Sequence, residues 1–234
     1  MADIRIDKYL SVALGISRND AKALLKSGKI SVDGKVASKP ETKVSQTAQV
    51  KCGEDLLSYK KHIYILMNKP EGILSASTDK RVKTVIDIIP EELKRTGLFP
   101  VGRLDKNTTG LLIITDDGDF GHRVTSPKSL IEKRYLVQLD GEVKEEYISV
   151  FEKGITLADG EKCMPAGLEI IDKNTAIVTI REGKYHQIKR MFGIVDLGVN
   201  SLKRLSIGKL TLPKGLSEGS VTELTEDEIC KIFQ

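Results

Sequence analysis

Apolar residues in the first part of the chain follow a helical period and then a strand-like one. Over residues 4–14 they recur close to helical spacing, and Gly15 is expected to end the helix that this spacing predicts. Ser17 is a suitable N-cap for a second helix, because an acidic residue follows it three positions later. Strand-like runs then flank Asp33-Gly34, a dipeptide typical of a tight hairpin turn. We therefore expect two helices followed by a hairpin.

From residue 63 onward, short apolar runs typical of buried strands alternate with amphipathic stretches. A polar segment precedes them, where the composition changes, and is the expected linker. We divide the chain into an N-terminal domain at 1–58, a linker at 59–62 and a larger domain at 63–234. The expected strands of the larger domain include 63–67, 111–115, 131–139 and 176–180, and the expected helices include 120–125, 143–154 and 186–195.

The net charge of +4 is distributed unevenly along the chain. Residues 1–61 contain 12 Lys and Arg against 7 Asp and Glu, whereas the remaining residues contain 25 against 26. Arg18, Lys22 and Lys26 stand four residues apart on the predicted second helix, and Lys29 follows its end. This basic row is either an ordinary solvated helix face or a surface that contacts the phosphates of a nucleic acid.

Several classes of protein find no support in the sequence. No run of about 18 apolar residues is present and the N-terminus lacks a signal-like apolar segment, so we expect a cytoplasmic protein with no membrane span. The three cysteines show no CxxC spacing, and the three histidines form no metal-binding pattern. We therefore expect neither a metal site nor an organic cofactor.

One acidic residue stands out by its position beside a predicted buried strand. Asp105 follows the breakers Pro100 and Gly102 and precedes the apolar run at 111–115, so we expect it in a loop held by a rigid strand. A carboxylate that takes part in chemistry is commonly presented in this way. The same pattern fits a turn in which the Asp105 side chain binds its own backbone. The local pattern leaves both interpretations open.

Three strings resemble the motifs of the pseudouridine synthases, in the branch that modifies the small ribosomal subunit. GRLDKNTTGLLIITDDGD at 102–119 resembles the central motif of that family, in which the aspartate is catalytic. EKRYLV at 132–137 resembles the second motif, and REGKYHQIKRMF at 181–192 resembles the third. Together the three strings are far more specific than a single short motif.

The resemblance extends to the rest of the chain and implies a fold. Residues 4–57 resemble the S4 RNA-binding domain, and YILMNKPEGILSAS at 64–77 resembles the first synthase motif. The implied architecture is α+β, with a small N-terminal S4-like RNA-binding domain and a catalytic domain on a mixed, largely antiparallel β-sheet. Lys69 stands before a proline in the first motif, and the resemblance allows it to contact RNA there. A lone lysine before a proline is more often a solvated turn residue, and we expect this role for Lys69.

The resemblance also implies roles for four residues. Asp105 would be the catalytic carboxylate, Tyr135 would stack on the target base, and Lys189 would pair with Asp105. Arg103 would occupy the gap left in the RNA or hold its phosphates. By base rate, a strand tyrosine is a half-buried sheet residue and a lysine near a helix start is a snorkelling surface residue. The matching neighbours of Tyr135 and Lys189 favour a functional role for both.

The implied activity is the isomerisation of one uridine in 16S rRNA to pseudouridine without a cofactor. The implied partner is 16S rRNA or a small-subunit assembly intermediate, and we expect a monomer. The alternatives are a 23S rRNA synthase, a non-catalytic rRNA-binding assembly factor, and an unrelated hydrolase that uses Asp105 and Asp117. An enzyme of the expected kind needs Asp105 and Lys189 within about 4 Å of each other, in a pocket open to RNA.

Overall fold

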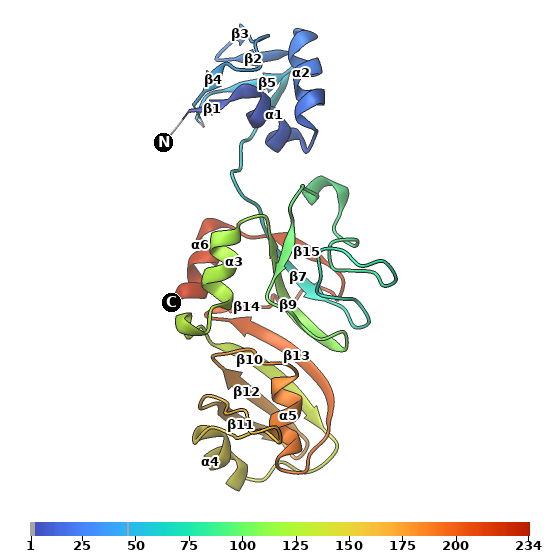
Figure 1. The fold of residues 1–234 in the computed structure, drawn as a ribbon, viewed down its shortest axis with the longest axis vertical. Coiled ribbons are helices and arrows are strands. Elements are labelled where there is room, and N and C mark those ends of the chain that lie inside the picture. The colour runs from blue at the N-terminus through green and yellow to red at the C-terminus, as the bar shows by residue number, and fades with distance from the viewer. Residues whose placement is uncertain (1–2, 46) are drawn as a thin grey trace. The chain divides into compact units, whose positions relative to one another are not determined.

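The contacts in the computed structural model divide the chain into two compact units (Figure 1). The N-terminal unit comprises Met1–His62 together with Glu91–Thr96, and the C-terminal unit comprises Ile63–Pro90 and Gly97–Gln234. A short segment that follows the first strand of the larger unit in the sequence, and includes the 3₁₀ helix η1 (Glu91–Leu93), thus groups with the first unit. The residues that the structure describes are 3–45 and 47–234.

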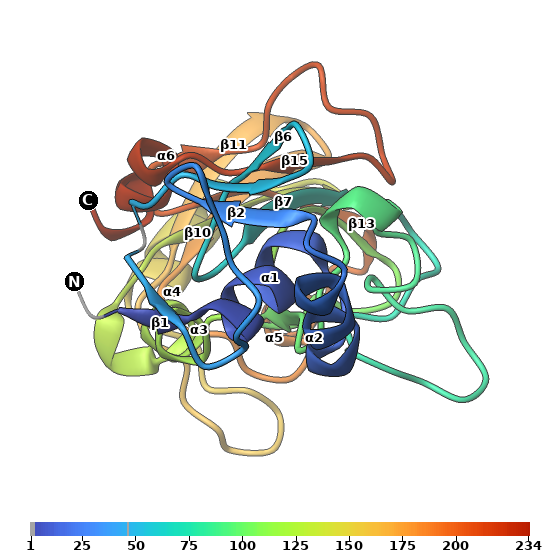
Figure 2. The same ribbon diagram turned by 90° about the horizontal axis from the view of Figure 1, so that it is seen from above.

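Two helices of the N-terminal unit pack against each other (Figure 2). α1 (Ile6–Leu14) ends at Gly15, which has the left-handed φ of 66° that glycine adopts without steric cost. α2 (Arg18–Lys26) begins at Ser17, whose side chain accepts a hydrogen bond from a backbone N–H of the first turn. Both caps confirm the sequence predictions. The first helix begins two residues later than predicted, because Ile4–Arg5 pairs as a strand instead.

A small antiparallel sheet completes the N-terminal unit. Asp33 and Gly34 have positive φ values of 47° and 81° and form the predicted hairpin turn between β2 (Ile30–Val32) and β3 (Lys35–Val36). The remaining strands are β1 (Ile4–Arg5), β4 (Lys43–Val44), β5 (Val50–Cys52) and β6 (Asp55–Leu57). The four-stranded sheet has the order β3-β2-β5-β6, while β1 and β4 form a separate pair.

The C-terminal unit is built on one mixed sheet of nine strands. β13 (Val199–Ile207) runs parallel to β9 (Thr108–Thr115), and every other pair among these strands is antiparallel. The other strands are β7 (Tyr64–Lys69), β8 (Phe99–Val101), β10 (Lys133–Leu139), β11 (Gly167–Asp172), β12 (Thr175–Ile180), β14 (Leu210–Thr211) and β15 (Val221–Glu223). The main order is β11-β12-β10-β13-β9-β7-β15, with β14 on β13 and β8 on β9. The expected mixed, largely antiparallel fold is confirmed.

Helices pack against this sheet at several points. α3 (Gly118–Thr125) begins at Asp117, whose side chain accepts a hydrogen bond from the backbone N–H of Phe120. This cap makes α3 start two residues earlier than predicted. Phe151 of α4 and Phe192 of α5 are in contact, with ring centroids 5.0 Å apart. The remaining helices are α4 (Glu146–Glu152), α5 (Gln187–Gly193), α6 (Glu226–Cys230), η2 (Pro127–Ser129) and η3 (Lys231–Phe233).

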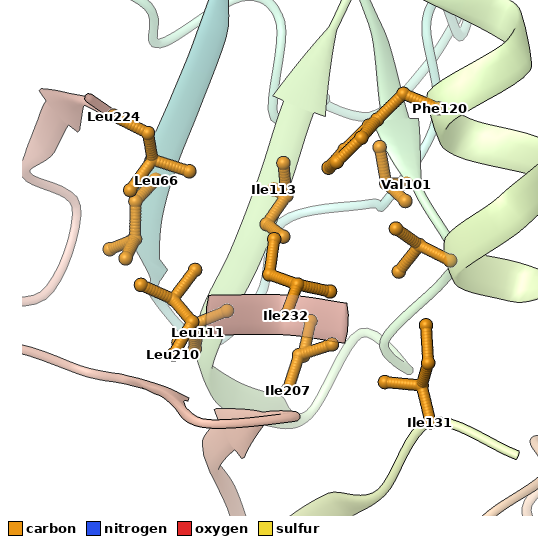
Figure 3. Packing of buried hydrophobic residues seen from close by; sticks show 11 residues of the cluster. Leu66, Val101, Leu111, Ile113, Phe120, Ile131, Ile207, Leu210, Leu224 and Ile232 are labelled. Carbon is orange, nitrogen blue, oxygen red and sulfur yellow. The ribbon is translucent and has the colours of Figure 1, made fainter. Parts of the chain in front are cut away.

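An apolar cluster joins β7 and β9 to the helices beside them (Figure 3). Leu66 and Ile113 come from these two strands, Phe120 from α3 and Ile232 from η3, and all four are buried. Removal of such side chains from water, at about 25 cal/mol per Å² of apolar surface, is the main force that holds the strands in place. The loop before β9 is therefore attached to a rigid strand.

The start of β9 approaches β13 unusually closely. Gly110 has a φ of +99°, and a Cβ built there would lie 2.3 Å from the carbonyl oxygen of Arg204. Only glycine fits this position without a shift of the backbone. The close approach sets the parallel pairing of β9 and β13 just after the loop that carries Asp105.

Among the described residues, no helix is long and apolar enough to cross a membrane. The same part of the chain contains no group of three or more His, Cys, Asp and Glu residues placed to hold a metal ion. Cys52, Cys163 and Cys230 are free.

Candidate active site

The backbone on both sides of Asp105 is fixed by hydrogen bonds. The Ser75 hydroxyl donates to the carbonyl of Leu104 at 2.9 Å and accepts from its N–H at 3.1 Å. The carbonyl of Asp105 accepts from the N–H of Thr108 at 3.0 Å, which closes a tight turn. The Asp105 side chain keeps 29% of its surface exposed. The loop therefore presents a partly open carboxylate on an ordered backbone.

The side chain of Lys69 binds the backbone of the same loop. The prediction that Lys69 is a solvated turn residue is wrong. Its side chain is fully buried, and its Nζ donates to three backbone carbonyls, including those of Lys106 at 3.2 Å and Thr108 at 3.0 Å. Burial lowers the pKa of Lys69 to about 8, although the negative charge of Asp105 opposes this shift. The carbonyls around the Asp105 loop converge on one ammonium group, which the local sequence does not reveal.

The start of α5 supplies two basic partners for the Asp105 carboxylate. Lys189 Nζ lies 3.8 Å from Oδ2, and His186 Nε2 lies 3.5 Å from Oδ1. The expected distance between Asp105 and Lys189 is met. His186 was not among the expected site residues. Helical spacing did not indicate it, because His186 precedes α5 and has a left-handed backbone.

The segment before α5 is held in shape by a buried amide. Gln187 donates from Nε2 to the Glu182 carboxylate at 2.9 Å, and its Oε1 accepts from the backbone N–H of Lys184 at 3.0 Å. Glu182 also accepts from the backbone N–H of Met164 at 2.8 Å. His186, within this segment, has a φ of 48°, a left-handed value that is uncommon for a residue other than glycine. The network therefore fixes an unusual backbone conformation directly beside Asp105.

Tyr135 faces the same cleft from β10 and is only 7% exposed. It shares its face of the strand with the buried Lys133 and Val137, as the alternation predicted. Arg204 lies behind it, with Nη1 3.4 Å from the tyrosine oxygen and Nε donating to the carbonyl of Leu111 at 2.7 Å. Burial, together with the nearby charge of Arg204, lowers the pKa of Lys133 to about 8.

These elements surround an open cleft of about 70 Å³. Arg103 is exposed and contributes to the wall of the cleft next to Asp105. Asp117 does not line it, because that carboxylate caps α3 and accepts the Tyr64 hydroxyl at 2.6 Å. The residues that line the cleft are Arg103, Leu104, Asp105, Thr108, Tyr135, Ile180, Gly183, Lys184, His186, Gln187, Ile188, Lys189 and Leu202.

The basic row of the N-terminal unit is only partly free for a nucleic acid. Lys22, Lys26 and Lys29 are exposed and form no ion pair with any other described residue. Arg18 is different, because its guanidinium lies 3.0 Å from the buried carboxylate of Asp7. Part of its charge therefore stabilises the packing of α1 against α2.

Comparisons with known proteins match both parts of the chain. The family model described as RNA pseudouridylate synthase matches residues 63–193, and that of the S4 domain matches residues 4–50. The uncharacterized RNA pseudouridine synthase YtzG of Bacillus subtilis is 42% identical over 97% of both chains. Ribosomal small subunit pseudouridine synthase A of Vibrio cholerae is 40% identical over 99% of this chain and 100% of that relative. A crystal structure of a pseudouridylate synthase, 35% identical, covers 98% of this chain and 99% of its own with a TM-score of 0.69.

Proposed function

Because the chain belongs to the RNA pseudouridylate synthase family, we propose that it converts one uridine of 16S rRNA to pseudouridine with Asp105 as the catalytic carboxylate. The main support is the placement of Asp105 and Lys189 within 3.8 Å of each other at an open cleft. A carboxylate beside a cation, at a cleft that a nucleotide can enter, is the arrangement that this isomerisation needs. The glycosidic C–N bond breaks, the uracil turns, and C5 of the base forms a C–C bond to the sugar; C5 then loses its proton and the freed N1 gains one, so the product is an isomer of the substrate.

The other cleft residues suit the handling of a displaced base. The target uridine must leave its stack, at a cost of a few kcal/mol, before Asp105 can reach the sugar. We propose that Tyr135 offsets part of this cost by stacking on the uracil, which is worth about 1–3 kcal/mol for an aromatic platform. Arg103, exposed next to Asp105, would occupy the gap in the RNA or hold the flanking phosphates.

Two lines of support favour 16S rRNA as the substrate. The V. cholerae relative that is 40% identical is named a ribosomal small subunit synthase, and so is the Pseudomonas aeruginosa relative that is 37% identical over 98% of this chain. The S4 domain, with Lys22, Lys26 and Lys29 on its surface, would anchor the RNA through phosphate contacts and shape. The proposed partner is therefore 16S rRNA or an assembly intermediate of the small subunit, bound by a cytoplasmic monomer.

The test is pseudouridine formation on in-vitro transcribed 16S and 23S rRNA and on partly assembled ribosomal particles. We expect the wild type to modify one 16S uridine, the Asp105→Asn variant none, and Asp119→Asn the same uridine as the wild type. Asp119 is a suitable control because it is exposed on α3 and lies outside the cleft. Modification of 23S rRNA alone would overturn the choice of substrate. If the protein bound the RNAs but modified none of them, a non-catalytic assembly factor would be the better interpretation.

A further inference from the structure

Tyr185 is the most exposed large apolar side chain among the described residues, at 75%. Its ring is stacked on that of His186, with centroids 3.9 Å apart and an angle of 21° between the planes. One face of the tyrosine is thus covered by the histidine. The aromatic pair presents a flat surface that has no role in the proposed isomerisation at Asp105.

The backbone that carries Tyr185 is held on both sides. The carbonyl of Tyr185 accepts from Arg190 Nη1 at 3.2 Å, and the backbone groups of Lys184 and Gln187 bind each other at 3.2 Å. Arg190 is in turn paired with Glu161 at 3.3 Å. An exposed ring on a fixed backbone, already oriented by a second ring, loses little conformational freedom when a ligand binds to it.

The pair also lies in direct continuity with the reaction centre. His186 Nε2 is 3.5 Å from the Asp105 carboxylate, so the two rings lead outward from the catalytic residue. Arg103 and Lys189 add positive charge to the same cleft, which suits a phosphodiester chain that enters it. A flat aromatic surface beside a cationic cleft is the general form of a stacking site for single-stranded nucleic acid.

We infer that Tyr185, supported by His186, is a stacking platform for an unpaired base adjacent to the target uridine. This inference rests on the proposed function and adds a second nucleotide to it. Tyr135 would receive the target base, and Tyr185 would receive a neighbour in the RNA chain. The platform holds the flanking backbone while the target uridine occupies the cleft, so it contributes to substrate binding and to the choice of site.

The absence of tryptophan from the sequence makes a direct test simple. A Tyr185→Trp substitution in the Asp105→Asn background provides a single tryptophan, at the platform, without turnover. The ligand is the shortest transcript fragment that the wild type modifies. We expect its binding to quench the tryptophan emission. Two further fragments carry an abasic site on either side of the target uridine, and we expect one of them to bind without quenching. Tyr147→Trp, which places the fluorophore outside the cleft, should show no such dependence.

Steady-state kinetics provide the second readout. Tyr185→Phe should retain the wild-type KM, whereas Tyr185→Leu, which is apolar but not planar, should raise KM by about 5- to 150-fold, as expected for one lost stacked base. The kcat of both variants should stay within about threefold of wild type. A wild-type KM in Tyr185→Leu, or equal quenching by every abasic fragment, would overturn the platform and leave the proposed function intact. A wild type that modifies no rRNA would overturn both.

Discussion

Two aspartates, Asp7 in the N-terminal unit and Asp105 in the C-terminal unit, each lie between two basic side chains, yet their surroundings are opposite. Asp7 is 1% exposed and makes close contacts to Arg5 at 3.1 Å and Arg18 at 3.0 Å. Burial by itself would raise the pKa of Asp7, but the hydrogen bond from Arg5 and the charge of Arg18 outweigh it, so the pKa is lowered. Asp7 therefore forms buried ion pairs, and the one with Arg18 holds α1 against α2.

Asp105 has the same kind of partners in a looser arrangement. His186 and Lys189 lie at 3.5 and 3.8 Å, beyond the usual length of a hydrogen bond, and 29% of the carboxylate side chain remains exposed. Its oxygen atoms therefore retain capacity for a substrate that enters the cleft. The comparison teaches that two basic side chains beside an acid do not identify an active site. Distance and access do.

The largest expected effect separates activity from stability at Asp105. The Asp105→Asn substitution should lower pseudouridine formation by more than about 100-fold, within the range of a lost acid–base group. The free energy of unfolding should change by less than about 0.5 kcal/mol, because the side chain is partly exposed and makes only long contacts. Urea unfolding and product mapping on the same preparations provide the two measurements. A large loss of stability would place Asp105 in the same class as Asp7.

A smaller effect is expected when Lys189 is replaced. Lys189→Gln should reduce kcat/KM by about 10- to 100-fold, which corresponds to about 1.4–2.7 kcal/mol of transition-state stabilisation. Lys189→Arg keeps the charge and should recover most of the activity, whereas the exposed Lys153→Gln, which removes the same charge outside the cleft, should match wild type. Equal losses in the Gln and Arg variants would show that shape, not charge, is required at this position.

Local features of the fold could be predicted because nearby residues determine them. Ser17 caps α2 with a residue three positions away, and Asp33-Gly34 turns a hairpin whose strands adjoin it. The alternation around Tyr135 correctly placed its side chain on the same face of β10 as Lys133 and Val137. The distance between Asp105 and Lys189 was expected only through resemblance, since more than eighty residues separate them in the sequence.

The features that escaped prediction depend on groups distant in sequence or on an unusual backbone. Lys69 is buried because carbonyls almost forty residues later surround its ammonium group, and no pattern near Lys69 indicates this. Arg18 was predicted as part of a basic row that is either solvated or contacts RNA, but α2 packs on α1 in a way that turns its charge toward Asp7. His186 escaped because its left-handed conformation depends on the Gln187 network.

Removal of the Asp7 carboxylate should lower the stability of the N-terminal unit alone. Asp7→Asn leaves Arg5 and Arg18 without their anion, but both guanidinium groups are about half exposed and can be hydrated. We therefore expect a loss of about 1.5–3 kcal/mol, the range for hydrogen bonds to charged groups. Hydrogen exchange in the full chain should show faster exchange in α1 and α2, with unchanged protection of β9 and β10. Equal loosening of both units would contradict this assignment.

The smallest expected effect is a pH dependence that belongs to Asp7. The folded pKa of Asp7 is below the unfolded value of 3.8, so the folded state binds fewer protons there. The stabilisation is therefore complete above the unfolded value and is lost as pH falls through 3.8 toward the lowered folded pKa. The stability difference between wild type and Asp7→Asn, measured by hydrogen exchange in α1 and α2, should shrink from pH 5.5 to pH 3. Other acids titrate in both proteins, so their contribution cancels in this difference. A difference that stays constant over this range would mean that the charge of Asp7 does not stabilise the N-terminal unit.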